Sequence, residues 1–310
     1  AKIWPTFAHA VLDITTFNMS LLPAMAGFSV GYLFKMNMVQ MSSIAGAAMV
    51  GSGVIVKTQQ GFGLAGTGDV INVGVTIVFS VLLAWLIGNK FKNYTILLLP
   101  IIVIIIGGSL GLLVLPYVKA VTGLIGAGIK TFTLLQPILM GGLMGIAFAV
   151  LICSPISSVG IAAAIGITGI ASGSANLGIT AGAFTLAIMG SSVNSLGTVI
   201  AHFFGTPKIQ MGNMLEKPIL YLPVAISSAI MGGLGAVFDI QGTPMSAGFG
   251  FSGLVGPLTA YGFMAPGWLS ILSLSCLFVA LPVLLGYLMK YIFIDKRKLI
   301  SATDLLLKTD

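Results

Sequence analysis

The stretch SPISSVGIAAAIGITGIASGSANLG, residues 154–178, carries a proline and three serines at the start of a long apolar pattern. Pro155 has no backbone N–H and disfavours helix at the residue before it, so we expect a helix to end here and another to restart near Ile156. Ser157 and Ser158 then fall in the first turn of the new helix. The stretch therefore predicts an interrupted helix.

The composition places this interrupted helix in a membrane protein. Of the 310 residues, 57% are hydrophobic and 7% are charged, whereas about a quarter are charged in a soluble domain. No segment alternates as the strands of an outer-membrane barrel do, and the 41 glycines suit helices that pack closely in lipid. We expect an all-α, polytopic helical membrane protein that lies in the lipid bilayer.

Several function classes lack support in the sequence. We find no Ser/His/Asp triad, metal-spaced cluster, Walker loop or dinucleotide fingerprint, so we expect no catalytic residue, no metal and no cofactor. Both cysteines, Cys153 and Cys276, lie in apolar runs and are expected to pack as small hydrophobic residues. The net charge of +7 comes mostly from lysines between apolar segments, and no basic face predicts binding to nucleic acid.

The apolar segments outline one transmembrane domain over residues 1–294 and a short tail over 295–310. They run over 6–34, 38–56, 70–88, 95–117, 137–153, 156–172, 178–205, 218–238 and 265–294. The segment 117–136 carries Lys119 and Lys130 on an apolar pattern, which predicts a helix at the membrane interface. The basic run DKRK at 295–298 predicts a cytoplasmic C-terminus. The chain starts Ala-Lys-Ile-Trp, and we expect a segment upstream, with room for a further helix.

The chain also repeats itself in order. PAMAGFSVGYLF (23–34) matches PILMGGLMGIAF (137–148), SSIAGAAMVG (42–51) matches SSVGIAAAIG (157–166), and ILLLP (96–100) matches ILYLP (219–223). Gly-Gly pairs at 107–108 and 232–233 follow the last match. We expect two repeats, over about 10–130 and 131–250, and a final helix over about 265–294.

Interruptions at corresponding places in two repeats predict the binding site of a transporter. In the first half we expect them at Ser42-Ser43 and in the loop 57–72; in the second, at 154–158 and in 172–194. Serines in a first helical turn suit an anionic or hydroxyl-rich ligand, and equally suit capping or helix–helix packing. The candidate substrate-binding residues are Pro155, Ser157, Ser158, Asn194, Ser42, Ser43, Gln60, Asp69, Asn72, Thr243, Ser246 and His202.

Two of these candidates, Asp69 and His202, have both a functional and a structural interpretation. Asp69 opens an apolar segment, where an ionisable residue is a functional candidate and where aspartate is also a favoured helix N-cap. His202 in AHFFG is either a satisfied structural histidine or a ligand and proton partner. The sequence leaves both pairs of alternatives open.

The chain resembles a known membrane family at GTPMSAGFGFSGLVGP (242–257), GDVIN (68–72), LQPILMG (135–141) and SPISSVGIA (154–162). It is similar to the EIIC-like family of the bacterial phosphotransferase system, which includes PfoR-type regulators. The resemblance covers nearly the whole chain. It implies a bacterial inner-membrane protein with a sugar-permease-like fold, and a homodimer. The phosphorylated cysteine and histidine modules of that system are missing here, so a phosphoryl donor would be a separate soluble chain.

Two functions follow as hypotheses. The first is transport of a small polar or anionic, sugar-like solute by alternating access at the interface of the two repeats. The alternative is a membrane-embedded ligand sensor or regulator without net transport. The chain is not expected to act as an enzyme by itself.

Overall fold

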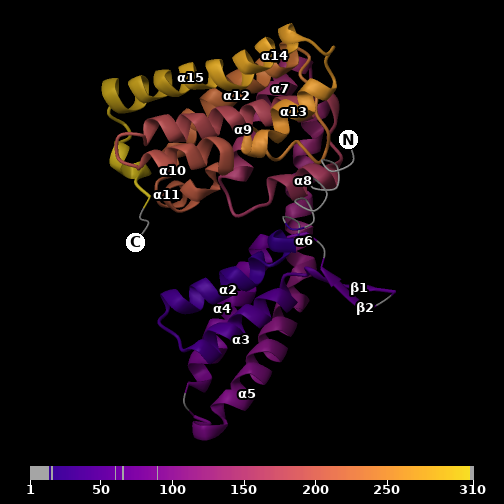
Figure 1. Cartoon of the computed structure of the whole chain (residues 1–310), viewed down its shortest axis with the longest axis vertical. Helices are drawn as coiled ribbons and strands as arrows, with labels where there is room; N and C mark the ends of the chain where they lie inside the picture. Colours follow the sequence, from indigo (N-terminus) through magenta and orange to yellow (C-terminus); the bar gives the residue numbers. More distant parts are fainter. Residues whose placement is uncertain (1–13, 15–16, 60, 65, 89, 308–310) are drawn as a thin grey trace, which may run out of the picture. The chain divides into compact units, whose positions relative to one another are not determined.

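The computed structural model describes residues 14, 17–59, 61–64, 66–88 and 90–307. The chain divides into two compact units, Ala1–Val121 and Thr122–Asp310, and the boundary falls within helix α6 (Gly108–Thr131). Within the described residues, helices dominate both units (Figure 1). Four helical segments there are long and apolar enough to cross a membrane: Val70–Ile87, Thr95–Leu134, Pro218–Val237 and Trp268–Lys296. The predicted all-α, polytopic membrane class is confirmed.

The first unit is built around α3. Its elements are α2 (Leu22–Leu33), α3 (Met38–Gly51), the hairpin β1 (Ile55–Thr58) and β2 (Gly61–Leu64), α4 (Val70–Ile87), α5 (Thr95–Ile102), the π-turn η2 (Val103–Gly107) and the first part of α6. Helix α3 packs against α2, α4 and α5 through small and β-branched side chains such as Ile44, Ala47 and Ala48, all fully buried. The hairpin extends away from these helices (Figure 1).

The helix break expected at Ser42-Ser43 is wrong. Helix α3 is continuous from Met38 to Gly51, and a capping box between Asn37 and Gln40 sets its start. The hydroxyls of Ser42 and Ser43 donate to the carbonyls one turn earlier, at 2.7 and 2.6 Å. Serine can satisfy its hydroxyl within a helix in this way, so a serine pair without a proline does not end one.

The helix expected over 117–136 has different bounds, and its place at the membrane interface stays a prediction. Helix α6 starts at Gly108, directly after η2, and runs through Pro116 to Thr131. It forms the second half of the apolar segment Thr95–Leu134. The lysines at 119 and 130 therefore belong to the later turns of a long helix.

The second unit has a central helix, α9 (Gly169–Met189). Residues 171–189 of α9 are all buried, and α7, α12 and α15 pack around it (Figure 1). The packing is close because the facing residues are small: a Cβ on Gly178 would lie 2.2 Å from the Cα of Gly145 in α7. Small residues let helix backbones approach in this way in membranes.

The remaining elements of the second unit surround this core. They are η3 (Phe132–Leu134), α7 (Pro137–Ile152), α8 (Ser158–Ile165), α10 (Leu196–Ile200), η4 (Ala201–Gly205), η5 (Pro207–Gln210), α11 (Met211–Glu216), η6 (Pro218–Leu220), α12 (Tyr221–Val237), η7 (Ser252–Leu254), α13 (Val255–Gly262), α14 (Trp268–Ser275), η8 (Cys276–Ala280), α15 (Leu281–Lys290), η9 (Tyr291–Lys296) and η10 (Ala302–Leu305).

The predicted interruption at Pro155 is confirmed. Helix α7 ends at Ile152, and α8 begins at Ser158 with Ser157 as its N-cap. The apolar segments expected over 156–172 and 178–205 are divided differently. Helix α8 ends at Ile165, its C-cap Gly166 is left-handed at φ +66°, and α9 then runs from Gly169 to Met189.

Candidate functional site

A pocket lies in the second unit where α9 begins. Gly169, the first residue of α9, has φ +59° and exchanges two backbone hydrogen bonds of 3.0 Å with Gly242. The N-cap Thr168 makes no side-chain capping bond, and the described residues offer no acceptor to the N–H groups of Ile170 and Ala171. The first turn of an α-helix needs outside acceptors for these groups. The start of α9 therefore presents free hydrogen-bond donors.

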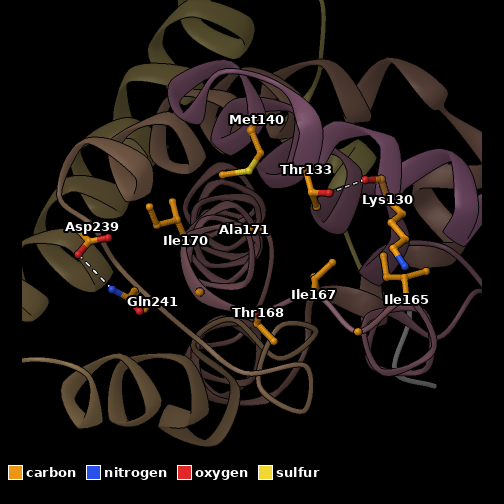
Figure 2. Close-up of a pocket in the computed structure, with 12 residues that line it drawn as sticks. Lys130, Thr133, Met140, Ile165, Ile167, Thr168, Ile170, Ala171, Asp239 and Gln241 are labelled. Atoms are coloured by element: carbon orange, nitrogen blue, oxygen red, sulfur yellow. Dashed lines mark hydrogen bonds between the residues drawn. The ribbon is translucent and has the colours of Figure 1, made fainter.

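The pocket has a volume of about 480 Å³, within the usual range for small-molecule sites. Figure 2 shows its lining around the axis of α9. The wall comes from four places in the chain: the end of α6 with η3, the α7 residue Met140, the α8–α9 connection with the first turn of α9, and the residues after α12. The lining residues are Lys130, Thr133, Met140, Ile165, Gly166, Ile167, Thr168, Gly169, Ile170, Ala171, Asp239 and Gln241.

One side of this pocket carries a cation. Lys130 lies in the last turn of α6, and the Thr133 hydroxyl donates to the Lys130 carbonyl at 2.7 Å. The side chain of Lys130 is exposed at the pocket, and it has no ion-pair partner in the described part of the chain. The ammonium group of Lys130 makes this side of the pocket electropositive.

The opposite side carries an acid and an amide (Figure 2). Asp239 follows the end of α12 with φ +51°, a conformation that aspartate tolerates better than most residues. The Gln241 Nε2 donates to the Asp239 Oδ2 at 3.1 Å. Among the described residues, the amide oxygen of Gln241 and the second carboxylate oxygen of Asp239 have no hydrogen-bond partner. Amide and carboxylate groups together can both donate to and accept from hydroxyl groups.

The connection from α12 to η7, residues 239–251, is non-helical and is tied to α8 and α9 by side chains. Ser158 Oγ donates to the Gly248 carbonyl at 2.9 Å, and Ser172 Oγ donates to the Thr243 carbonyl at 2.8 Å. Buried Asn176 accepts from the Gly250 N–H at 3.0 Å. Irregular backbone inside a membrane protein needs such partners, because lipid offers none.

Three of the predicted site residues, Ser158, Thr243 and Ser246, therefore make hydrogen bonds that hold this connection. Besides the Ser158 bond, Thr243 and Ser246 close a turn: Thr243 N–H donates to Ser246 Oγ at 3.0 Å, and Ser246 N–H donates to Thr243 Oγ1 at 3.2 Å. Ser157 caps α8 by accepting from the Gly160 N–H at 3.0 Å. None of these hydroxyls lines the pocket.

Lys208 holds the break around Pro155. Its ammonium donates to the carbonyls of Ser154 and Ile156, the latter at 3.1 Å. A cation at the C-terminal end of α7 also suits the helix dipole. Burial disfavours the charged form and lowers the pKa of Lys208.

Asn194 holds the C-terminal tail. Its Nδ2 donates to the Leu305 carbonyl at 2.8 Å, and its Oδ1 accepts from the Leu307 N–H at 2.9 Å. Lys217 pairs with Asp304 in the same tail. Burial alone would raise the pKa of the Asp304 carboxyl, but hydrogen bonds from Lys217 and from the Ser301 backbone outweigh it and lower this pKa.

His202 lies in the π-turn η4 and is 1% exposed. Its Nδ1 donates to the Thr198 carbonyl at 2.7 Å, whereas its Nε2 has no partner among the described residues. The structural and the proton-partner alternatives both stay open for this histidine.

The predicted residues of the first unit make local contacts. Asp69 is the N-cap of α4 and accepts from the Asn72 N–H at 2.9 Å. Buried Asn72 donates to the carbonyls of Gly51 and Gly111, at 2.6 and 2.8 Å, and so ties α4 to α3 and α6. Gln60 lies outside the described residues. A ligand role for these residues, as for the others predicted, stays a prediction.

Sequence reasoning missed every residue that lines the pocket. The signals were faint: ITG at 167–169 within the opening stretch, and the polar DIQG at 239–242 after an apolar segment. Lys130 stood out only as a charge on an apolar pattern. No local pattern relates these three places, because the fold brings them together.

Comparison with known proteins gives one match. No curated protein and no solved structure matches the chain. The family model described as "Phosphotransferase system, EIIC" matches residues 2–307, which is nearly the full length. With its apolar helices, this makes the protein a membrane component of the phosphotransferase system. The chain belongs to the EIIC family of the phosphotransferase system.

Proposed function

We propose that this EIIC protein moves a small, sugar-like solute across the bacterial inner membrane and binds it in the pocket at the start of α9. The observation that carries the proposal is the lining of this pocket: free helix N–H donors, the Thr168 hydroxyl and the Asp239–Gln241 pair converge on one space of about 480 Å³. Apolar Met140 and Ile170 add surfaces for the C–H face of a sugar ring. A few convergent polar groups in an otherwise apolar pocket are typical of solute sites.

We propose alternating access as the mechanism, with α8 as the moving part. Helix α8 has eight residues and lies between two breaks, the Pro155 turn and the pair of left-handed glycines Gly166 and Gly169. Its end, Ile165, and the connection that follows line the pocket. Movement of α8 would therefore change access to the solute without unpacking α9.

We propose that the C-terminus lies in the cytoplasm, where soluble phosphotransferase partners are available. The tail contacts Asn194, Gln210 and Asn213, so the basic residues near the tail lie at the same end of the second unit as Lys208 and Lys217. Clustered lysine and arginine favour the cytoplasmic side. Two repeats and a homodimer remain part of the proposal.

Uptake into liposomes tests this function. Purified protein is reconstituted with and without soluble phosphotransferase components inside, and uptake of a panel of labelled monosaccharides is measured. We expect uptake of at least one sugar, and about a tenfold loss for Gln241→Ala, since a polar contact to the solute is removed. Gln136→Ala is the matched control, because exposed Gln136 lies outside the pocket.

The outcomes separate transport from the alternative. Binding without uptake under both conditions would favour the membrane-embedded sensor. Neither binding nor uptake of any member of the panel would refute the proposed function.

A further inference from the structure

The break at Pro155 is held by a side chain from another element. Residues 153–157 join α7 to α8 without a regular helical ladder, and Pro155 has no N–H to donate to one. The ammonium of Lys208 donates to the carbonyls of Ser154 and Ile156, on both sides of the proline, the latter at 3.1 Å. A charged donor makes stronger hydrogen bonds than a neutral one, and a carbonyl left unpaired away from water is costly. The position of Lys208 therefore sets the geometry of the break.

Lys208 lies in η5, and the C-terminal tail holds this element. Gln210, two residues after Lys208, is fully buried, and its Nε2 donates to the Leu305 carbonyl at 2.9 Å. Asn213 in α11 donates to the Gln210 Oε1 at 2.7 Å and to the Leu306 carbonyl at 3.1 Å. The tail lies beside α10 and α11 (Figure 1). The tail therefore fixes the element that presents Lys208 to the break.

The tail also fixes the start of the segment that joins α9 to α12. Asn194 donates to the Leu305 carbonyl at 2.8 Å and accepts from the Leu307 N–H at 2.9 Å. Farther along the segment, Phe203 of η4 packs against Phe184 of α9, with ring centroids 4.4 Å apart. This contact holds η4 to the core whether or not the tail is in place. Release of the tail would therefore loosen η5 and α11 more than η4.

We infer that the docked C-terminal tail is a latch on α8, and that Lys208 carries its effect to the Pro155 break. While the tail is docked, Lys208 stays between the two carbonyls, and α8 keeps its place beside the pocket that Ile165 lines. When the tail leaves, η5 relaxes, Lys208 withdraws and α8 moves more easily. The inference rests on the proposed function, because it takes α8 as the moving part of the transporter. Lys208 is then a positioning residue, since it acts on α8 and does not line the pocket.

Labelling of Cys153 by a thiol-reactive dye, on the full chain in nanodiscs, tests the inference without any solute. Cys153 is buried directly before the break, and exposed Cys276 is replaced by serine. We expect Lys208→Met to raise the labelling rate about tenfold, because the break loses charge-assisted hydrogen bonds. Asn194→Ala, which releases the tail, should raise it about threefold. Lys208→Arg keeps the donors and should restore slow labelling. Lys290→Met is the matched control, since half-buried Lys290 in α15 makes no hydrogen bond to the break.

A double-mutant cycle tests whether the tail acts through Lys208. Asn194→Ala should add nothing to the labelling rate of Lys208→Met, because the connection is already cut. A second reporter separates opening of the break from opening of the whole unit. This reporter is Ala187→Cys at a buried position of α9, in a chain whose two native cysteines are replaced by alanine. Its labelling rate should not change with Asn194→Ala.

Three results would overturn the inference. They are additive effects of the two variants on the labelling rate, unchanged Cys153 labelling in Lys208→Met, and equal rises at both reporters. If Lys208→Met does not fold, Lys208→Gln replaces it and should also raise the labelling rate, because a shorter neutral donor holds the break less well. None of these results concerns sugar, so the transport proposal then stands. Failure of sugar uptake with the expected labelling pattern would refute the transport proposal and leave the latch on α8 in place.

Discussion

Gly248→Ala should destabilise the second unit through a backbone clash. A Cβ at this position would lie 2.4 Å from the Val159 nitrogen and 2.5 Å from its Cα, both in α8. Backbone cannot rotate away as a side chain can, so α8 and the α12–η7 connection must separate. Overpacking costs about 1–3 kcal/mol, and weakening the Ser158–Gly248 hydrogen bond adds about 1 kcal/mol.

The free energy of unfolding of the second unit should therefore fall by about 2–4 kcal/mol, which lowers Tm by about 5–15 °C for a unit of this size. Buried Cys153 at the end of α7 reports the unfolding, because a thiol-reactive dye labels it only when this region opens. Exposed Cys276 is first replaced by serine. Gly212→Ala is the control, since its Cβ would meet nothing within 4 Å. Equal midpoint temperatures of dye labelling for Gly248→Ala and Gly212→Ala would refute this close packing of α8 against the α12–η7 connection.

Three further predictions concern the tail, its ion pair and the first unit. Asn194→Ala removes the bonds to the tail, so limited proteolysis should release the tail faster while unfolding of the core is unchanged. Asp304 has a lowered pKa, so its pairing with Lys217 stabilises the docked tail at pH values above the unfolded pKa near 3.8. This stabilisation is lost as the pH falls through the lower pKa of the folded state. Hydrogen exchange in the tail should therefore increase only below about pH 4. Asn72→Leu removes the hydrogen bonds to two buried carbonyls, and the free energy of unfolding of the first unit should fall by about 2–4 kcal/mol, measured by thermal unfolding.

Local chemistry made part of the fold predictable. Hydropathy indicated the helical membrane class, and Pro155 marked the end of α7 because a missing N–H acts wherever it occurs. Asp69 was identified as an N-cap alternative on its position alone, and it caps α4. Ser42-Ser43 misled because serine hydroxyls bond back within a helix, so the helix continues.

The pocket was not predictable in the same way. Its polar groups come from the end of α6, the start of α9 and the turn after α12, and only the packing of the second unit brings Lys130, Thr168 and Gln241 to one space. The serines predicted as site residues have hydroxyl groups, which bind ligands and backbone groups equally well. In the structure, Ser158 and Ser246 satisfy the backbone of the α12–η7 connection, a demand that arises only in the folded chain.

A density map of the full chain, recorded by electron cryo-microscopy with the tightest-binding sugar, tests the central claim most directly. The account predicts ligand density in the pocket at the start of α9, beside Gln241. Ligand density beside Ser157 or Asn194, with the pocket empty, would contradict it.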